Sequence, residues 1–246
     1  MKALIPRSHP RAQSLYIRER LVKAFESGLV AREGLMAHGR GEAFDYLIGE
    51  KTTRSAERAI RAAAFMLTHA QNPVISVNGN IAGLCPKEVV ELAGVTDAKI
   101  EVNLFYSSEK RKMDIFRTLR KNGAAEVLGL KKKDSARISG LESARRTVDK
   151  NGIYAADVVV VPLEDGDRTI ALKKAGKKVI TFDLNPLSRT ARTADITIVD
   201  NVVRGMQKLV LECKKNPKAN RFDNRKNLSE AVMEIKNNLE RRAKNA

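Results

Sequence analysis

Three short apolar runs rich in β-branched residues lie close together in the second half of the chain, and they constrain its fold most strongly. They span residues 157–161, 178–183 and 195–199, and each is short enough to be a buried strand of a parallel sheet. Between the first two runs, residues 169–175 have helical character and precede Gly176, a residue type common just after a helix end. This alternation predicts an α/β fold with a mostly parallel sheet flanked by helices.

Polar side chains follow each of these three strands. In open α/β sheets, ligands bind beyond the carboxyl ends of the strands, where such side chains gather. Ordinary connectors do not explain three polar clusters on successive strand ends, so we predict a binding site there. Its candidate residues are Glu164, Asp165, Asp167, Arg168, Asp183, Asn185, Ser188, Arg189, Asp200 and Asn201.

The rest of the chain adds elements of the same kind. We predict further strands at residues 74–77, 99–105 and 125–128. Apolar residues at helical spacing predict helices at residues 15–28, 55–70, 86–92, 109–121 and 202–214. Residues 1–213 are therefore expected to form one α/β domain that begins with a helical segment.

Other segments look like solvated connections. Residues 131–137 are predicted to be a basic loop, and residues 140–150 a solvated helix or loop. Residues 214–246 read as a basic linker followed by an amphipathic helix at 228–242. The apolar stripe of that helix needs a partner, which is either the same domain or a second subunit.

The formal charge of +17 is concentrated in two places. Residues 110–150 hold 13 Lys and Arg against 5 Asp and Glu, and residues 214–246 hold 10 against 4. Nucleic-acid binding is one explanation, but aromatic residues make up 4% and Trp is absent, so solvated basic faces are favoured. The positive electrostatic potential of these basic segments would also favour a small anionic substrate. Two cysteines without metal-ligand spacing, and no evident signal peptide, predict a cytoplasmic protein.

A glycine-rich motif near the N-terminus contains His38, Gly39, Arg40 and Gly41. We expect it just before an amphipathic helix, where free backbone N–H groups and a guanidinium would bind an oxyanion. His38 could instead be a turn residue bonded to the backbone. Glu42 and Asp45, which share a helix face, could support Arg40 or be surface carboxylates.

Two further features carry open alternatives. Asn78, Gly79 and Asn80 follow a predicted strand and form either a structural turn or a loop that fits against a ligand. Arg18 is a solvated helix residue unless another anion-binding group lies nearby, in which case it becomes a phosphate ligand.

Several blocks of the sequence resemble the archaeal phosphopantothenate synthetases, also called 4-phosphopantoate–β-alanine ligases. The resemblance covers roughly the first 205 residues and is carried by HPR at 9–11, GLMAHGRGEAFDYLIGE at 34–50, NPVISVNGN at 72–80, EVNLFY at 101–106, ADVVVVPLEDGDRT at 156–169 and DLNPLSRTARTADITIVDN at 183–201. The sequence departs from the family pattern at Ser107, Ser139 and Ser143.

The resemblance implies a Rossmann-like fold, a homodimer and a step of archaeal coenzyme A biosynthesis. The implied reaction joins 4-phosphopantoate to β-alanine with ATP, and it yields 4-phosphopantothenate, AMP and diphosphate through a phosphopantoyl-adenylate. Carried over by position, ATP binding falls on Arg18, Arg40, Asp183, Leu184, Asn185, Ser188, Arg189, Asp200 and Asn201.

Adenylation brings two anions together, so cationic side chains and Mg²⁺ are expected to neutralise the developing charge. Arg18, Arg40 and Arg189 are the candidates, because each guanidinium can contact a phosphate through two donors. Asp165, Asp167 or Glu164 could hold the β-alanine ammonium and assist its deprotonation, coordinate Mg²⁺, or simply pair with Arg168. The phosphate of 4-phosphopantoate is assigned to His38, Asn78, Asn80 or Arg168.

Two other classes compete with the ligase. A nicotinamide-dependent oxidoreductase could use the same fold, but the chain lacks G-x-G-x-x-G. A basic nucleic-acid-binding protein would show strongly salt-dependent binding to any duplex.

Overall fold

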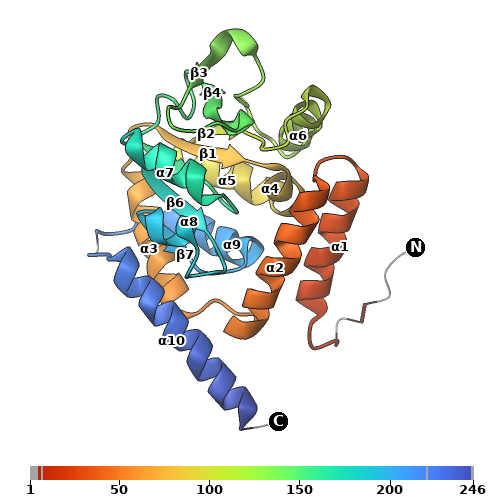
Figure 1. Ribbon diagram of the computed structural model, residues 1–246, viewed down its shortest axis with the longest axis vertical. Helices are drawn as coiled ribbons and strands as arrows, with labels where there is room; N and C mark the ends of the chain where they lie inside the picture. Colours follow the sequence, from red (N-terminus) through yellow and green to blue (C-terminus); the bar gives the residue numbers. More distant parts are fainter. Residues whose placement is uncertain (1–4, 7, 220, 245–246) are drawn as a thin grey trace.

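A five-stranded parallel sheet forms the centre of the molecule. The computed structural model describes residues 5, 6, 8–219 and 221–244. The strand order is β2-β1-β5-β6-β7, and Figure 1 shows helices on both sides of the sheet. This confirms the predicted α/β class. The strands are β1 (Pro73–Val77), β2 (Lys99–Val102), β5 (Val158–Val160), β6 (Lys178–Phe182) and β7 (Ile196–Ile198).

Ten α-helices surround the sheet in the described residues, and a two-stranded antiparallel hairpin stands apart from it. The hairpin consists of β3 (Ser135–Arg137) and β4 (Thr147–Asp149), with short 3₁₀ turns at Lys132–Asp134 and Ala144–Arg146. The helices are α1 (Ala12–Glu26), α2 (Arg32–Ile48), α3 (Arg54–Thr68), α4 (Gly79–Leu84), α5 (Pro86–Thr96), α6 (Glu109–Lys121), α7 (Gly166–Lys174), α8 (Arg189–Thr193), α9 (Val202–Cys213) and α10 (Asn224–Ala243).

Both faces of the sheet are buried, which explains why its strands read as continuous apolar runs. On β5, Val158 and Val160 join the larger core beneath α3, α5 and α9, while Val159 packs into a second core under α7 and the hairpin. Alternate residues of a strand point to opposite faces, so a strand covered on both sides needs apolar residues at every position.

The His38–Gly41 motif does not precede a helix. It lies inside α2, which begins at Arg32, so the expectation of free backbone N–H groups at this motif is wrong. Backbone N–H groups in a helix interior bond to carbonyls four residues earlier and are not available to an oxyanion. One nearby glycine serves packing instead: a Cβ on Gly34 would lie 2.3 Å from Oδ1 of Asn80.

Four other expectations about elements are corrected. Residues 131–137 are not a loop throughout, because they contain a 3₁₀ turn at Lys132–Asp134 and strand β3. Residues 140–150 are not a solvated segment, because Val148 and Asp149 are buried within β4. Residues 125–128 form no strand and contribute one bridge, between Leu128 and Glu101. The strand predicted at 99–105 ends at Val102, where the chain leaves the sheet edge.

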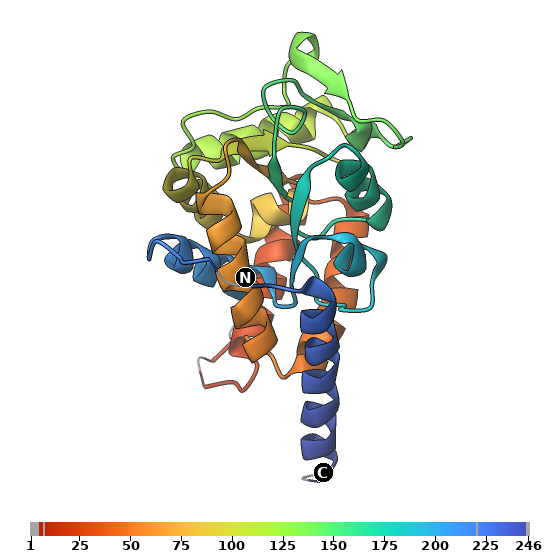
Figure 2. The same ribbon diagram turned by 90° about the vertical axis from the view of Figure 1, so that its left-hand side faces the viewer.

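The C-terminal helix α10 docks on its own chain. Leu228 and Ala231 are buried beside Ile48 of α2, and Asn238 donates to the Leu47 carbonyl at 2.7 Å. The Asn224 side chain donates to the carbonyl of Ala191 at 2.9 Å. Figure 2 shows the C-terminal turns of α10 extending past the rest of the molecule.

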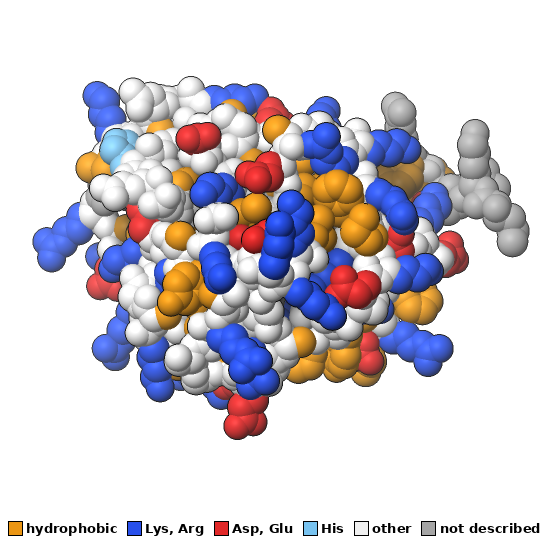
Figure 3. Space-filling model, turned by 90° about the horizontal axis from the view of Figure 1, so that it is seen from above, with side chains coloured by type: hydrophobic (Ala, Val, Ile, Leu, Met, Phe, Trp, Pro, Cys, Tyr) orange, Lys and Arg blue, Asp and Glu red, His pale blue; other side chains and the backbone are white. Residues whose placement is uncertain are grey.

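The basic side chains do not merge into one stripe on the face that carries the hairpin and α6. Figure 3 shows Lys and Arg on this face as separate clusters, with acidic and apolar side chains between them. Within the described residues, none of the helices combines the length and the apolar character that a membrane crossing requires.

Candidate active site

One large cavity, of about 710 Å³, opens at the carboxyl ends of the parallel strands. It is lined by α2 and by the segments that follow β1, β2, β5, β6 and β7. The chain moves from β1 to the edge strand β2 and later returns to β5 on the other side of β1. Such a reversal separates the two connecting segments and leaves a crevice, which is where open α/β sheets bind ligands.

Four helices begin at this cavity, and each start is capped by a polar side chain. Asn78 accepts from the Ile81 N–H at 3.1 Å, and Asp165 accepts from the Arg168 N–H at 2.8 Å. The other two caps follow the same pattern. Ser188 accepts from the Ala191 N–H at 2.9 Å, and Asn201 accepts from the Val203 N–H at 3.0 Å.

These caps explain why polar residues follow the strands. In each case the side chain satisfies a backbone N–H that the first helical turn leaves unpaired. The starts of the longer helices α7 and α9 also carry partial positive charge toward the cavity. The cavity is therefore suited to anionic groups.

Two arginines line the cavity without a carboxylate partner in the described part of the chain. Arg40 comes from α2 and Arg111 from α6. By contrast, Arg189 pairs with Asp167 at 3.1 Å. A guanidinium with no acidic partner is a candidate ligand for phosphate or carboxylate, which it can bind through two parallel hydrogen bonds.

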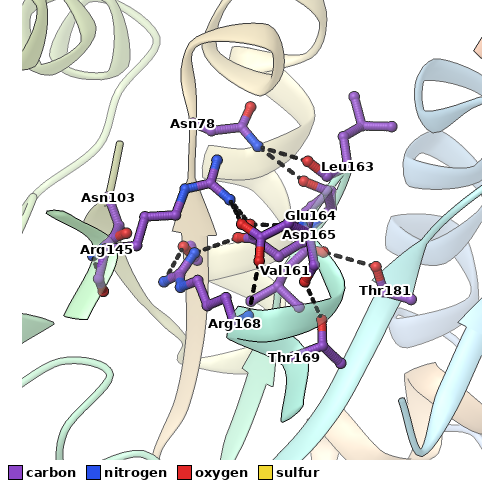
Figure 4. Close-up of polar contacts among 12 residues, drawn as sticks. Asn78, Asn103, Arg145, Val161, Leu163, Glu164, Asp165, Arg168, Thr169 and Thr181 are labelled. Carbon is purple, nitrogen blue, oxygen red and sulfur yellow. Dashed lines mark hydrogen bonds and ion pairs between the residues drawn. The ribbon is translucent and has the colours of Figure 1, made fainter. Parts of the chain in front are cut away.

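A buried network of charges lies behind the segment after β5. Arg145 and Arg168 both pair with Glu164, whose side chain is 2% exposed, and Figure 4 shows the two guanidinium groups converging on that carboxylate. Arg168 also donates to Oγ of Ser76 at 3.1 Å. Arg145 donates to Asp165 at 3.1 Å.

Burial is the main influence on both arginines of this network. It lowers the pKa of Arg145 to about 10 and that of Arg168 to about 10, although each remains cationic at neutral pH. Because Glu164 lies between two cations and away from solvent, it is not free to hold an ammonium group or a metal ion.

A second set of contacts shapes the cavity wall after β6. Asp183 accepts from the Asn185 N–H at 2.9 Å and from Oγ of Ser188. Burial raises the pKa of Asp183, and these hydrogen bonds oppose the rise. Leu184, the next residue along the chain, is buried, with 7% of its surface exposed.

The loop after β7 is held from behind by an ion-paired cluster. Arg204 pairs with Asp200 and Asp45, and Thr52 donates to Asp200 at 2.7 Å. Asp45 is 1% exposed, so it is not a surface carboxylate, and it pairs with Arg204 rather than supporting Arg40. Glu42 likewise pairs with Arg18 at 2.7 Å and with Arg11.

On α2 and the loop after β1, the remaining polar groups also have protein contacts. Asn78 donates to the Pro162 carbonyl at 3.0 Å, and Asn80 donates to the Gly34 carbonyl at 2.9 Å. His38 lines the cavity, and burial lowers its pKa below the usual value. Its imidazole is therefore neutral at pH 7.

The structure brings most of the candidate residues from the sequence to one cavity. Those that line it are His38, Arg40, Asn78, Asn80, Glu164, Asp165, Asp183, Leu184, Asn185, Ser188, Arg189 and Asn201. Four others do not line it. Arg18 reaches its rim through Glu42, Asp167 pairs with Arg189, and Arg168 and Asp200 lie in the buried clusters behind the wall.

Among the lining residues that sequence reasoning did not select are two aromatics and two arginines, namely Phe105, Tyr106, Arg111 and Arg145. The two aromatics follow β2, so the strand-end rule that selected the other candidates could have included them. Arg145 had no such signal. Its position depends on Asn103, whose side chain donates to the Thr147 carbonyl at 2.9 Å and holds this segment over the end of β2.

No group of three or more His, Cys, Asp and Glu residues is placed to hold a metal ion within residues 5, 6, 8–219 and 221–244. A divalent cation at this cavity would therefore depend on oxygen atoms of a ligand as well as on protein carboxylates.

Comparison with known proteins relates the chain to one group of ligases. Residues 55–238 match the model of the phosphopantothenate/pantothenate synthetase family. The chain is 54% identical over 245 residues to the 4-phosphopantoate–β-alanine ligase of Thermococcus onnurineus, covering 96% of this chain and 93% of that protein. It is 51% identical over 244 residues to the enzyme of the same name from Methanosarcina mazei, covering 96% and 95% of the two chains.

A third relative gives the same result. The 4-phosphopantoate–β-alanine ligase of Thermococcus kodakarensis is 53% identical over 249 residues, which cover 97% of this chain and 95% of that protein. The match extends from the cavity motifs into α10, and the chain belongs to the phosphopantothenate/pantothenate synthetase family.

Proposed function

We propose that this protein joins 4-phosphopantoate to β-alanine, using ATP, to give 4-phosphopantothenate, AMP and diphosphate. The names of its relatives support the two substrates. The observation that carries the proposal is the cavity itself, where four capped helix starts and two arginines without carboxylate partners among the described residues meet at the reversal of strand order.

The nucleotide is proposed to occupy the part of the cavity beside β6 and β7. Asp183 would accept from the ribose hydroxyls, with Leu184 and Asn185 beside it, and Ser188 and Arg189 would hold phosphate oxygens at the start of α8. Arg40 would approach the phosphates from α2, and Asn201 would complete the wall. Asp200 and Arg18 then act from behind, through Arg204 and Glu42.

Mg²⁺ is proposed to enter with ATP rather than to occupy a site made only of protein ligands. Mg²⁺ is usually bound through one or two carboxylates together with substrate phosphates, and the absence of a three-residue cluster in the described residues fits that arrangement. The side chain of Glu164 is closed between two arginines, so it is not available as a protein ligand to the ion. The ion would supply charge neutralisation at the phosphates.

In the first half-reaction, a carboxylate oxygen of 4-phosphopantoate attacks the α-phosphorus of ATP and the bond to diphosphate breaks. The product is the acyl-adenylate. Arg40 and Arg189 would stabilise the negative charge that builds on the phosphate oxygens, since guanidinium groups bind such oxygens through two donors.

In the second half-reaction, the β-alanine nitrogen attacks the acyl carbon and AMP leaves with the electrons of the C–O bond. The attacking amine must be neutral, so its ammonium form has to lose a proton first. Asp165 is the best placed of the three carboxylates considered. Glu164 is enclosed, and the Asp167 side chain is 64% exposed and does not line the cavity.

Product analysis tests the function directly. The protein is incubated with ATP, Mg²⁺, 4-phosphopantoate and β-alanine, and the nucleotide and the amide are separated and quantified. AMP and 4-phosphopantothenate in equal amounts are expected. Formation of ADP would reject the adenylate route, and the absence of amide product would reject the function.

The assembly and compartment are also proposals. We infer a homodimer in the cytoplasm, as implied by resemblance to the family. The free thiols of Cys85 and Cys213, both buried, are consistent with a reducing compartment. Light scattering coupled to size-exclusion chromatography tests the dimer, and a mass near 27.2 kDa would reject it.

A further inference from the structure

The cavity has a second cationic end that the nucleotide does not explain. Arg111 and Arg145 line it where β2 ends, together with Phe105 and Tyr106. The proposed ribose and phosphate ligands lie at the ends of β6 and β7, at least three strands further along the sheet. With neighbouring strands about 4.8 Å apart, the two ends are separated by roughly 14 Å.

Arg111 has donors that the described residues do not use. Its Nη1 donates to the Tyr106 carbonyl at 2.6 Å, but its Nε is buried without a hydrogen-bond partner. No carboxylate pairs with Arg111 in the part of the chain that the structure describes. Arg117 of the same helix differs, since it pairs with Asp114 at 3.0 Å.

Arg145 lines the same cavity and is more deeply buried. Its side chain is 9% exposed, and its Nε is likewise buried without a partner. The guanidinium lies 5.6 Å from the centre of the Phe105 ring. A buried N–H group without an acceptor is costly, and an oxygen-rich ligand would remove that cost.

The charges at this end favour an anion. Glu164 and Asp165 are balanced by Arg145 and Arg168. Arg111 therefore adds one cation that the local carboxylates do not neutralise. Phe105 and Tyr106 are 45% and 50% exposed and offer apolar surface beside this charge. The ligand that fits is an anionic group next to an apolar part of the same molecule.

We propose that Arg111, together with Arg145 on the same cavity wall, binds the phosphate ester of 4-phosphopantoate and so selects the phosphorylated acid over free pantoate. This inference rests on the proposed function. It differs from the assignment made from sequence, in which the phosphate falls on His38, Asn78, Asn80 or Arg168. Arg168 does not line the cavity, and both asparagines already bond to backbone carbonyls of this chain.

The test measures discrimination between the phosphorylated and the free acid. Calorimetry gives the Kd of 4-phosphopantoate and of pantoate for the wild type, for Arg111→Gln and for the control Arg117→Gln on the same helix. In Arg111→Gln, the Kd of 4-phosphopantoate should rise at least tenfold, while the Kd values of pantoate and ATP change less than threefold. Arg117→Gln should match the wild type.

Arg111 also holds the Tyr106 carbonyl, so its loss could disturb the loop. Arg111→Lys keeps the positive charge and a donor for that carbonyl, so it separates loss of the phosphate contact from disturbance of the loop. It should bind 4-phosphopantoate more tightly than Arg111→Gln and more weakly than the wild type. An equal loss of pantoate, 4-phosphopantoate and ATP binding would overturn the phosphate assignment, as would unchanged discrimination.

The same preparations separate this inference from the proposed function. If the wild type forms AMP and amide but Arg111→Gln discriminates as well as the wild type, the phosphate subsite is wrong and the ligase function stands. If the wild type forms no amide, the ligase function itself fails, and the subsite fails with it.

Discussion

Arg204 donates two hydrogen bonds to Asp45, at 3.0 and 2.6 Å, and thereby joins α9 to α2. The same guanidinium pairs with Asp200, directly after β7. Asn201 adds a hydrogen bond of 3.2 Å to Asp45. Because α2 carries Arg40 and His38, these contacts set where both side chains meet the cavity.

Removing this link should destabilise the fold. Arg204→Met leaves the Asp45 and Asp200 carboxylates buried without their cation, and it should lower the free energy of unfolding by about 3 kcal/mol. Urea denaturation measures the change. Lys208→Met, on the same helix and with a more exposed side chain, is the control and should change stability by less than about 0.5 kcal/mol. Equal stability of the two variants would contradict the role of Arg204.

Arg40 is expected to act on the nucleotide. Arg40→Ala should reduce kcat/KM for ATP by about 30-fold, or about 2 kcal/mol of transition-state stabilisation, because a charge-assisted contact to phosphate is lost. The measurement is steady-state AMP formation. Arg32→Ala, at the exposed start of the same helix, should remain close to the wild type. Wild-type kinetics in Arg40→Ala would remove this residue from the site.

Asp165 should matter for the second half-reaction more than the first. Asp165→Asn can still cap α7 but cannot accept a proton, so amide formation should fall by about 100-fold or more. ATP–diphosphate exchange, which reports the adenylation step, should fall much less. Asp167→Asn outside the cavity serves as the control. Equal loss of both half-reactions would point to metal or phosphate binding instead.

Glu101 should make stability depend on pH. It is fully buried beneath the site, where it accepts from the N–H groups of Asp149 and Ile153, and burial raises its pKa from 4.5 to about 7. Since the folded pKa lies above the unfolded one, its contribution is complete below about pH 4.5 and is lost as pH rises to about 7.

The loss from Glu101 can reach about 3 kcal/mol. It is measured as the difference in unfolding free energy between pH 4.5 and pH 8. Glu101→Gln should be less stable overall but should lose much less across this range, whereas exposed Glu126→Gln should keep the slope of the wild type. If the unfolding free energy of Glu101→Gln changes with pH as much as that of the wild type, Glu101 does not titrate in this interval.

His38 should titrate below its ordinary value. Burial is the main cause of its lowered pKa, the positive charge of Arg18 adds to it, and Glu42 opposes it. An NMR titration of the imidazole should give a midpoint below 6.5. Arg18→Ala should raise that midpoint, and Arg117→Ala on α6 should not. A midpoint above 6.5 in the wild type would show that burial is not the main influence on the pKa of His38.

Local sequence patterns predicted the strands of the sheet correctly, but they placed the His38–Gly41 motif on α2 wrongly. The apolar runs at 157–161 and 178–183 became β5 and β6, because short runs rich in β-branched residues are typical of strands buried between two layers. The glycines of the His38–Gly41 motif suggested a helix start, but α2 runs through them. Their helix-breaking tendency, about 1 kcal/mol each, is small beside the packing of the whole helix.

The sequence by itself determined the class of fold, the edge of the sheet where the cavity opens and most of the residues that we propose to bind the nucleotide, because strand periodicity and strand-end polarity are local properties. Only the tertiary structure decided which charges are open to a ligand. Glu164 reaches the cavity wall and Arg168 lies close to it in the sequence, yet the two charges neutralise each other in the interior. Arg111 and Arg145 come from a basic stretch that looks solvated, and they reach the cavity because the chain folds back over the end of β2. Pairing between residues far apart in sequence depends on packing, and no local pattern encodes it.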